Sequence, residues 1–138
     1  MFKAEQCTRW TPYVLGILRI VTGFLFLQHG SAKLLGVPAL PMFADGVQLM
    51  SLMGLAGILE LVGGTMILLG LFTRPVAFIL SGQMAVAYFM AHAPQAFLPI
   101  LNQGELAALY SFVFLYFAFA GAGALSLDSK YCNRSKME

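Results

Sequence analysis

Six polar or ionisable residues interrupt long apolar stretches of the chain, and they are the residues with which it could do chemistry: Arg19, His29, Lys33, Glu60, Gln83 and Glu105. Charged groups inside a membrane segment are costly, so they pair with one another and often mark functional sites. Histidine, lysine and glutamine could donate hydrogen bonds to the head group of a ligand, and a buried glutamate could titrate. We interpret these residues as a candidate ligand-binding site or buried polar cluster.

Sequence motifs assign no catalytic residue. Ser31 and Ser81 lack the GxSxG-like context of a nucleophile, and the histidines and cysteines do not have metal-binding spacing. We therefore predict no metal site, and the sequence leaves open whether the protein is an enzyme.

The composition is that of a membrane protein. Of the 138 residues, 59% are hydrophobic and only 10% are charged, whereas soluble domains carry roughly 25% charged residues. A soluble enzyme is therefore excluded, and the lipid bilayer is the first predicted partner. The net charge of +2 comes without a basic run, which excludes nucleic acid as a partner.

Four long apolar runs predict membrane-spanning helices, at about residues 12–36, 49–71, 74–93 and 103–122. About 20 residues at 1.5 Å each match a hydrocarbon core roughly 30 Å thick. Pro12 is suited to begin the first helix and Gly36 to end it. The predicted fold is all-α: a single transmembrane domain over residues 1–138, arranged as a four-helix bundle.

The second predicted helix carries its charge beside glycines. Gly57, Glu60 and Gly64 fall on one helical face. Small residues allow the backbone of another helix to approach closely. We therefore expect this face to pack against a neighbouring helix.

Lysine and arginine are distributed unevenly between the two sides of the predicted bundle. One side would carry Lys3, Arg9, Arg74, Lys130, Arg134 and Lys136, and the other only Lys33. Because cationic residues accumulate in cytoplasmic segments, both termini are predicted to be cytoplasmic.

Depth along the predicted helices suggests how the charges pair. Counted from the helix centres, Arg19 lies roughly 7 Å to the cytoplasmic side and Lys33 roughly 13 Å to the outer side, and Glu60 lies near the midplane. We predict that Arg19 pairs with Glu60 and that Lys33 pairs with Glu105. The remaining polar groups would lie between the two pairs: His29 and Gln83.

Each of these residues also has a structural interpretation. Arg19 and Glu60 could form a pair that only fixes helix register, and Lys33 could anchor its helix at the membrane interface. Glu105 could favour the positive N-terminal end of the fourth helix. His29 could be a hydrogen-bonded packing residue.

Four segments together resemble the DoxX family of small bacterial membrane proteins: RIVTGFLFLQHGSAKLLG, GILELVGGTMILLGLFTRPVA, NQGELAALY and LSLD. The resemblance covers roughly residues 18–128, with Asn102-Gln103-Gly104-Glu105 where the family tends to read NGGE. It implies a multi-pass four-helix bundle in the bacterial inner (plasma) membrane. The positions that match the family's motifs are Arg19, His29, Gly30, Lys33, Glu60, Gly63, Gly64, Arg74, Glu105 and Asp128.

The resemblance also orders the candidate functions. Relatives are associated with membrane oxidoreductase assemblies, thiosulfate oxidation to quinone and oxidative-stress defence. The first hypothesis is therefore an accessory, quinone- or lipid-facing subunit of such a system, with quinone as a ligand, no intrinsic cofactor and a partner oxidoreductase that supplies the electrons. Two alternatives stay open: a small proton-coupled transporter, for which a homo-oligomer would provide room, and a structural or assembly factor of the membrane.

Overall fold

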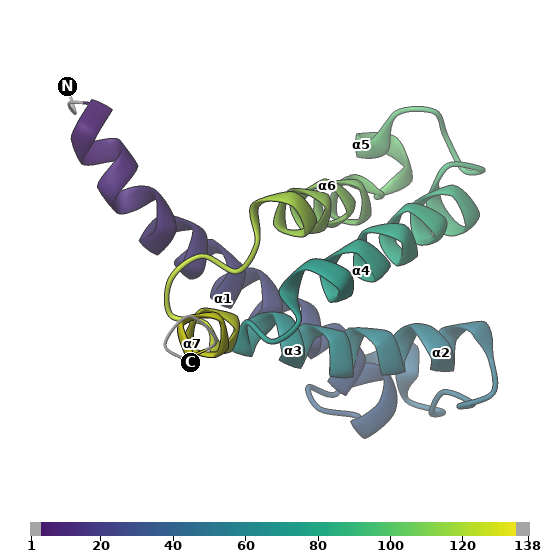
Figure 1. Ribbon diagram of the computed structural model, residues 1–138. Helices are drawn as coiled ribbons and strands as arrows, with labels where there is room; N and C mark the ends of the chain where they lie inside the picture. Colours follow the sequence, from purple (N-terminus) through teal and green to yellow (C-terminus); the bar gives the residue numbers. More distant parts are fainter. Residues whose placement is uncertain (1–3, 135–138) are drawn as a thin grey trace. The chain divides into compact units, whose positions relative to one another are not determined.

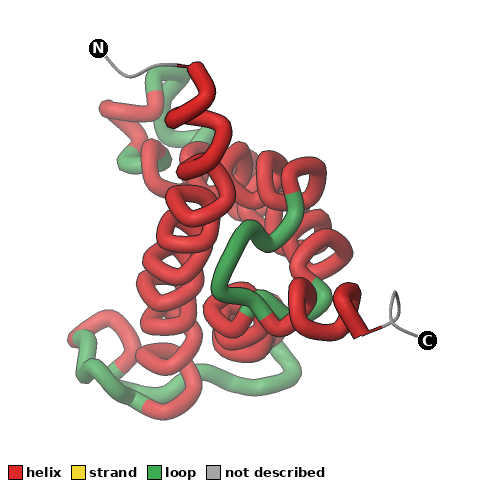
Figure 2. The backbone as a smooth tube through the Cα atoms, turned by 60° about the vertical axis from the view of Figure 1, so that its left-hand side comes forward, coloured by secondary structure: helices red, strands yellow, loops and turns green. Residues whose placement is uncertain are grey.

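The computed structural model describes residues 4–134, and within this range the chain forms helices and loops without a strand (Figure 2). The chain divides into two compact units, which are described separately. The first contains the residues up to Thr73 and those from Ala122 onward, and the second is Arg74–Gly121. Lys3 and Lys136, which contributed to the predicted orientation, lie outside the described residues.

The first unit is built on one long helix. Helix α1 (Ala4–Leu35) packs against a second, interrupted helix that consists of α2 (Leu52–Ile58), the π-helical turn η2 (Leu59–Gly63) and α3 (Gly64–Leu69) (Figure 1). A short 3₁₀ turn, η1 (Pro41–Phe43), lies in the connection between them. The C-terminal helix α7 (Leu127–Arg134) completes this unit.

The start of the first helix differs from the prediction. Pro12 lies inside α1, which is already helical at Ala4, so the expected start at Pro12 is wrong. Proline removes only one backbone donor, and the polar turns before it remain helical, with the hydroxyls of Thr8 and Thr11 bonded to carbonyls four residues earlier. The predicted end is confirmed, because α1 stops at Leu35 and Gly36 has a positive φ of 66°.

Glycines set how closely α1 approaches the second helix. A Cβ atom added to Gly30 would lie 2.3 Å from the backbone nitrogen of Leu61, and one added to Gly64 would lie 2.8 Å from that of Leu27. Only glycine allows backbones so close together without a shift. The predicted packing of the face that carries Gly57 and Gly64 is therefore confirmed.

Local signals explain where the second helix begins and ends. Ser51 caps the first turn, with its hydroxyl accepting a hydrogen bond from Gly54 N at 3.0 Å. The helix ends at Leu69, followed by Gly70 in the left-handed conformation. The predicted span of 49–71 was therefore right in its core and two or three residues too long at each end.

The second unit is a helical hairpin. Helix α4 (Thr73–Ala87) continues into the π-helical turn η3 (Tyr88–His92), and α6 (Glu105–Ala120) returns after the short helix α5 (Pro99–Asn102). Ser81 and Ser111 join the hairpin, since each hydroxyl donates to the other residue's carbonyl, at 2.8 and 3.1 Å. Arg74 donates to the carbonyls of Ala118 and Phe119 at the end of α6.

Within residues 4–134, three helical segments are long and apolar enough to cross a membrane: Ala4–Leu35, Leu52–Leu69 and Thr73–His92. The fourth predicted helix, at 103–122, is present as α6, but its 16 residues span only about 24 Å. The left-handed Gln103 precedes it and Gly121, with a φ of 87°, follows it. The chain is thus an all-helical membrane protein. The four-helix bundle and the single domain stay predictions.

Candidate functional site

A buried ion pair joins the two helices of the first unit. The Lys33 ammonium lies 2.6 Å from both carboxylate oxygens of Glu60. The two side chains are only 13% and 7% exposed. An ammonium has three N–H donors, and two of them are used by the contacts with Glu60.

The surrounding backbone brings these two side chains together. Lys33 is in the last turn of α1, and Glu60 is in the π-helical turn of the second helix. Gly57 lies under the Lys33 side chain, where an added Cβ would be 3.3 Å from Lys33 Cβ. Single π-helical turns inside α-helices occur frequently at functional sites. The Lys33–Glu60 pair is therefore the strongest candidate for function in this unit.

Arg19 has a different partner from the one predicted. It is fully buried, and its guanidinium donates to backbone carbonyls only: Ile67, Leu68, Ala122, Ala124 and Leu125. The predicted pairing of Arg19 with Glu60 is therefore wrong. The carbonyls of Ile67 and Leu68 belong to the last turn of α3, where helical carbonyls have no partner within the helix and a cation is favoured.

Arg19 thus holds the C-terminal segment of the chain to α1 and α3. Its Nε lies 3.0 Å from the carbonyl of Ala122, and one Nη lies 2.7 Å from that of Leu125. The backbone adds a further bond, from Ala124 N to the carbonyl of Pro12 at 2.8 Å. This arrangement gives Arg19 a structural role rather than a place in a ligand site.

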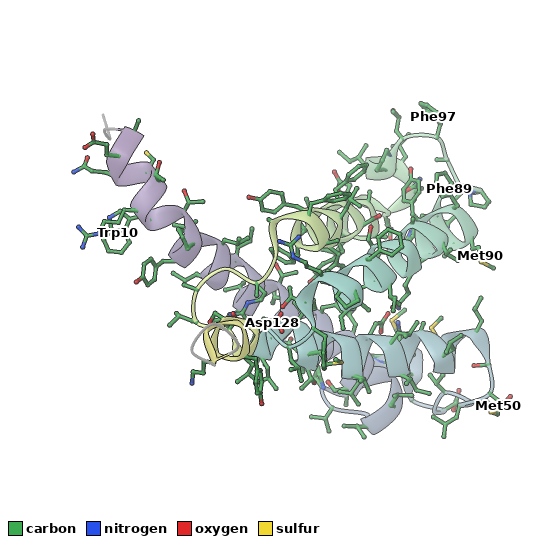
Figure 3. The ribbon with its side chains drawn as sticks, viewed as in Figure 1. Trp10, Met50, Phe89, Met90, Phe97 and Asp128 are labelled. Carbon is green, nitrogen blue, oxygen red and sulfur yellow. The ribbon has the colours of Figure 1, made fainter. Side chains whose placement is uncertain are left out.

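Asp128 completes this attachment from the other side. Its carboxylate accepts hydrogen bonds from Phe72 N at 2.8 Å and Thr73 N at 2.9 Å, at the start of α4, and its own N–H donates to the carbonyl of Gly70. Figure 3 shows where Asp128 lies. A carboxylate at a helix N-terminus satisfies donors that have no partner within the helix.

We expect Asp128→Ala to lower the free energy of unfolding by about 2 kcal/mol, the upper end for loss of a helix cap, and Asp128→Asn by about 1 kcal/mol. Thermal unfolding in detergent measures both. Asp45→Ala is the matched control, because Asp45 is exposed in a loop. If Asp45→Ala and Asp128→Ala lower the free energy of unfolding equally, Asp128 does not cap α4.

The other predicted site residues are divided between the two units. His29 is an exposed residue of α1. In the second unit, Gln83 is half-buried on α4, and Glu105 is exposed as the first residue of α6. The predicted pairing of Lys33 with Glu105 would join the two units, and it stays a prediction.

A second polar cluster, which was not predicted, is formed by Tyr88, His92 and Asn102 in the second unit. Asn102 is buried, and its side-chain amide donates to the carbonyl of Ala96 at 2.8 Å and to the Tyr88 hydroxyl at 3.4 Å. Its side-chain oxygen accepts from Gly104 N at 2.8 Å, and its carbonyl lies 2.9 Å from His92 Nδ1. The Asn-x-Gly spacing was the available signal, because asparagine side chains often bond to the backbone two residues further on.

Comparison with known proteins gives one family. The DoxX family model matches residues 14–93. A Haemophilus influenzae protein, named only as uncharacterized, is 48% identical over 89% of this chain and 94% of its own length. A Bacillus subtilis protein named "Putative oxidoreductase CatD" is 27% identical over 81% of this chain and 82% of its own. An uncharacterized membrane protein of Mycobacterium tuberculosis is 28% identical over 86% of this chain and 81% of its own. No solved structure matches.

Proposed function

The chain belongs to the DoxX family of membrane proteins, and on this premise we propose that it is a quinone-facing, non-catalytic subunit of an oxidoreductase in the bacterial inner membrane. The proposed topology is a multi-pass four-helix bundle with both termini in the cytoplasm. Electrons would come from a partner oxidoreductase, because the sequence carries no redox cofactor motif. The Bacillus subtilis relative whose name includes oxidoreductase supports this class of function.

The Lys33–Glu60 pair is the observation that carries the proposal. A quinone head group needs a hydrogen-bond donor beside an apolar surface, and the third N–H of Lys33 is such a donor. The residues that follow Lys33 supply the apolar surface, since Leu35 and Val37 are exposed. Glu60 holds the Lys33 ammonium in place through two contacts of 2.6 Å.

Quinone retention tests the proposal. Protein purified in mild detergent is extracted with organic solvent, and the quinone per mole of protein is measured by chromatography. We expect wild type to retain quinone, and Lys33→Met to bind it roughly 10–100-fold more weakly, as expected for the loss of one hydrogen bond from a charged donor. Lys130→Met is the matched control, because Lys130 is an exposed lysine of α7 in the same unit.

A double variant separates binding from folding. Removing one partner leaves a buried charge alone, whereas replacing a buried pair with apolar residues is often neutral or stabilising. Lys33→Met combined with Glu60→Leu should therefore fold and still lack quinone. The proposal is overturned if this folded double variant retains quinone. It is also overturned if wild type contains no quinone and no oxidoreductase co-purifies with it.

A small proton-coupled transporter is the second candidate, favoured by the position of Glu60 in a π-helical turn within an apolar helix. Proton flux into liposomes, followed with an internal pH-sensitive dye, distinguishes the two functions. A flux that Glu60→Gln abolishes and Glu5→Gln leaves intact would favour the transporter. The third hypothesis, a structural or assembly factor, fits what Arg19 and Asp128 do but leaves the Lys33–Glu60 pair without a role.

A further inference from the structure

The loop at residues 93–104, between η3 and α6, presents large apolar side chains outward. Phe97 is 92% exposed and lies at the turn of this loop in Figure 3. Ile100 and Leu101, on the short helix α5, are 69% and 68% exposed. A contiguous exposed apolar patch of this kind marks a surface that binds a protein, a membrane or a ligand.

The same loop lacks the charges of a water-facing connection. Residues 75–104 contain no aspartate, glutamate, lysine or arginine. The side chains just before the loop continue its apolar surface, because Phe89 and Met90 of η3 are also exposed (Figure 3). The loop is therefore continuous with the apolar surface of the membrane-spanning segment Thr73–His92.

Several backbone N–H groups of the loop bond to carbonyls of the loop or of η3. Pro94 and Pro99 have no N–H to satisfy. Within α5, the N–H groups of Leu101 and Asn102 both donate to the carbonyl of Leu98. In water, loop backbone groups can bond to solvent, whereas in lipid they must be satisfied within the protein.

Asn102 satisfies groups that α5 does not reach. Its side-chain amide donates to the carbonyl of Ala96, and its side-chain oxygen accepts from Gly104 N. His92 Nδ1 lies at hydrogen-bonding distance from the Asn102 carbonyl. The buried polar side chain of the loop, Asn102, is thus turned inward, whereas the large apolar side chains are turned outward, as are Gln95 and Gln103.

We propose that residues 93–104 form a membrane-embedded interfacial segment, with Phe97, Ile100 and Leu101 inserted among the phospholipid acyl chains at the surface where η3 ends. Lipid is the favoured occupant because the patch continues a membrane-spanning surface and offers no charge that would orient a protein partner. The loop after α1 also presents exposed apolar side chains, although it carries the exposed Asp45. Its Met42 and Met50 are 77% and 101% exposed, and Phe43 N and Ala44 N bond within the turn η1.

Tryptophan fluorescence tests this proposal. Trp10 is the single tryptophan, so Trp10→Phe provides a dark background into which Phe97→Trp is introduced. The protein is reconstituted in phosphatidylcholine vesicles, either unmodified or brominated on the acyl chains, and quenching by acrylamide is measured separately. Tyr131→Trp in the same background is the matched control, because Tyr131 is an exposed aromatic residue on the polar helix α7.

We expect blue-shifted emission from position 97, strong quenching by brominated lipid, and acrylamide quenching about threefold weaker than at position 131. Emission from position 97 that is red-shifted and open to acrylamide would overturn the proposal, because the loop would then face water. Protection from both quenchers would overturn it as well, because a protein partner or a second copy would cover the loop. Size-exclusion profiles that match wild type establish that both variants are folded.

Discussion

Replacing Arg19 with methionine is expected to lower the free energy of unfolding by about 3 kcal/mol or more. The guanidinium is the shared donor for carbonyls at the end of α3 and in the segment that leads to α7. Methionine fills a similar volume but donates nothing, so these carbonyls lose the guanidinium as a donor, at a cost of roughly 1–3 kcal/mol for each one left without a partner. The carbonyl of Ile67 keeps its bond from Gly70 N. The same change also removes a cation from the negative end of α3.

Denaturant titration in mixed micelles measures this difference, and Arg9→Met is the matched control because Arg9 is exposed on the same helix. Arg19→Lys should recover only part of the stability, since an ammonium cannot reach both sets of carbonyls in the planar geometry of a guanidinium. If Arg19→Met lies within about 0.5 kcal/mol of Arg9→Met, the size of an ordinary surface substitution, Arg19 does not hold the C-terminal segment in place.

The helices could be predicted because length and hydropathy are properties of the sequence alone. The ranges 49–71 and 74–93 correspond closely to Leu52–Leu69 and Thr73–His92. The misplaced ends have local causes. Pro12 resembled a start signal, although the turns before it are helical. Helix α7 was not among the predicted helices, although Ser126, which accepts a hydrogen bond from Ser129 N, provides an N-cap signal.

The ion pairs were harder to predict, because depth was counted from the centre of each helix. Helix α1 has 32 residues, whereas the segment Leu52–Leu69 that packs against it has 18. The predicted ranges 12–36 and 49–71 have their centres at residues 24 and 60, but it is Gly30, not residue 24, that closely approaches Leu61 and sets the register. This register brings Lys33 to Glu60.

The partners of Arg19 were out of reach for a different reason. The partners of Arg19 are backbone carbonyls, which every residue has, so no residue type in the sequence marks them. Counting carboxylates could therefore not identify these partners. The left-handed Gly70 after α3 and the glycines around residues 121–123 were the only hints of a chain reversal there. The cluster around Asn102 was missed because it depends on loop geometry rather than on charge.

The second substitution with a large expected effect on stability is at Gly30, because this glycine sets the register of α1 against the second helix of the first unit. Gly30→Ala is expected to lower the free energy of unfolding by about 3 kcal/mol, the upper end for an overpacked core. The added Cβ would lie 2.3 Å from Leu61 N and 2.7 Å from the carbonyl of Gly57, and both are backbone atoms that no rotamer change can move away. Helix α1 must therefore separate from the second helix.

Gly82→Ala in α4 is the matched control, because an added Cβ there meets no atom within 4 Å. Alanine is the better helix former by up to about 1 kcal/mol, so the two substitutions should change stability in opposite directions in the same denaturant titration. Gly30 is also one turn from Lys33, and a displaced α1 would lengthen the 2.6 Å contacts with Glu60. The Gly30→Ala variant should therefore bind less quinone and be less stable. If its free energy of unfolding equals that of wild type, glycine packing does not set the helix register on which the Lys33–Glu60 pair depends.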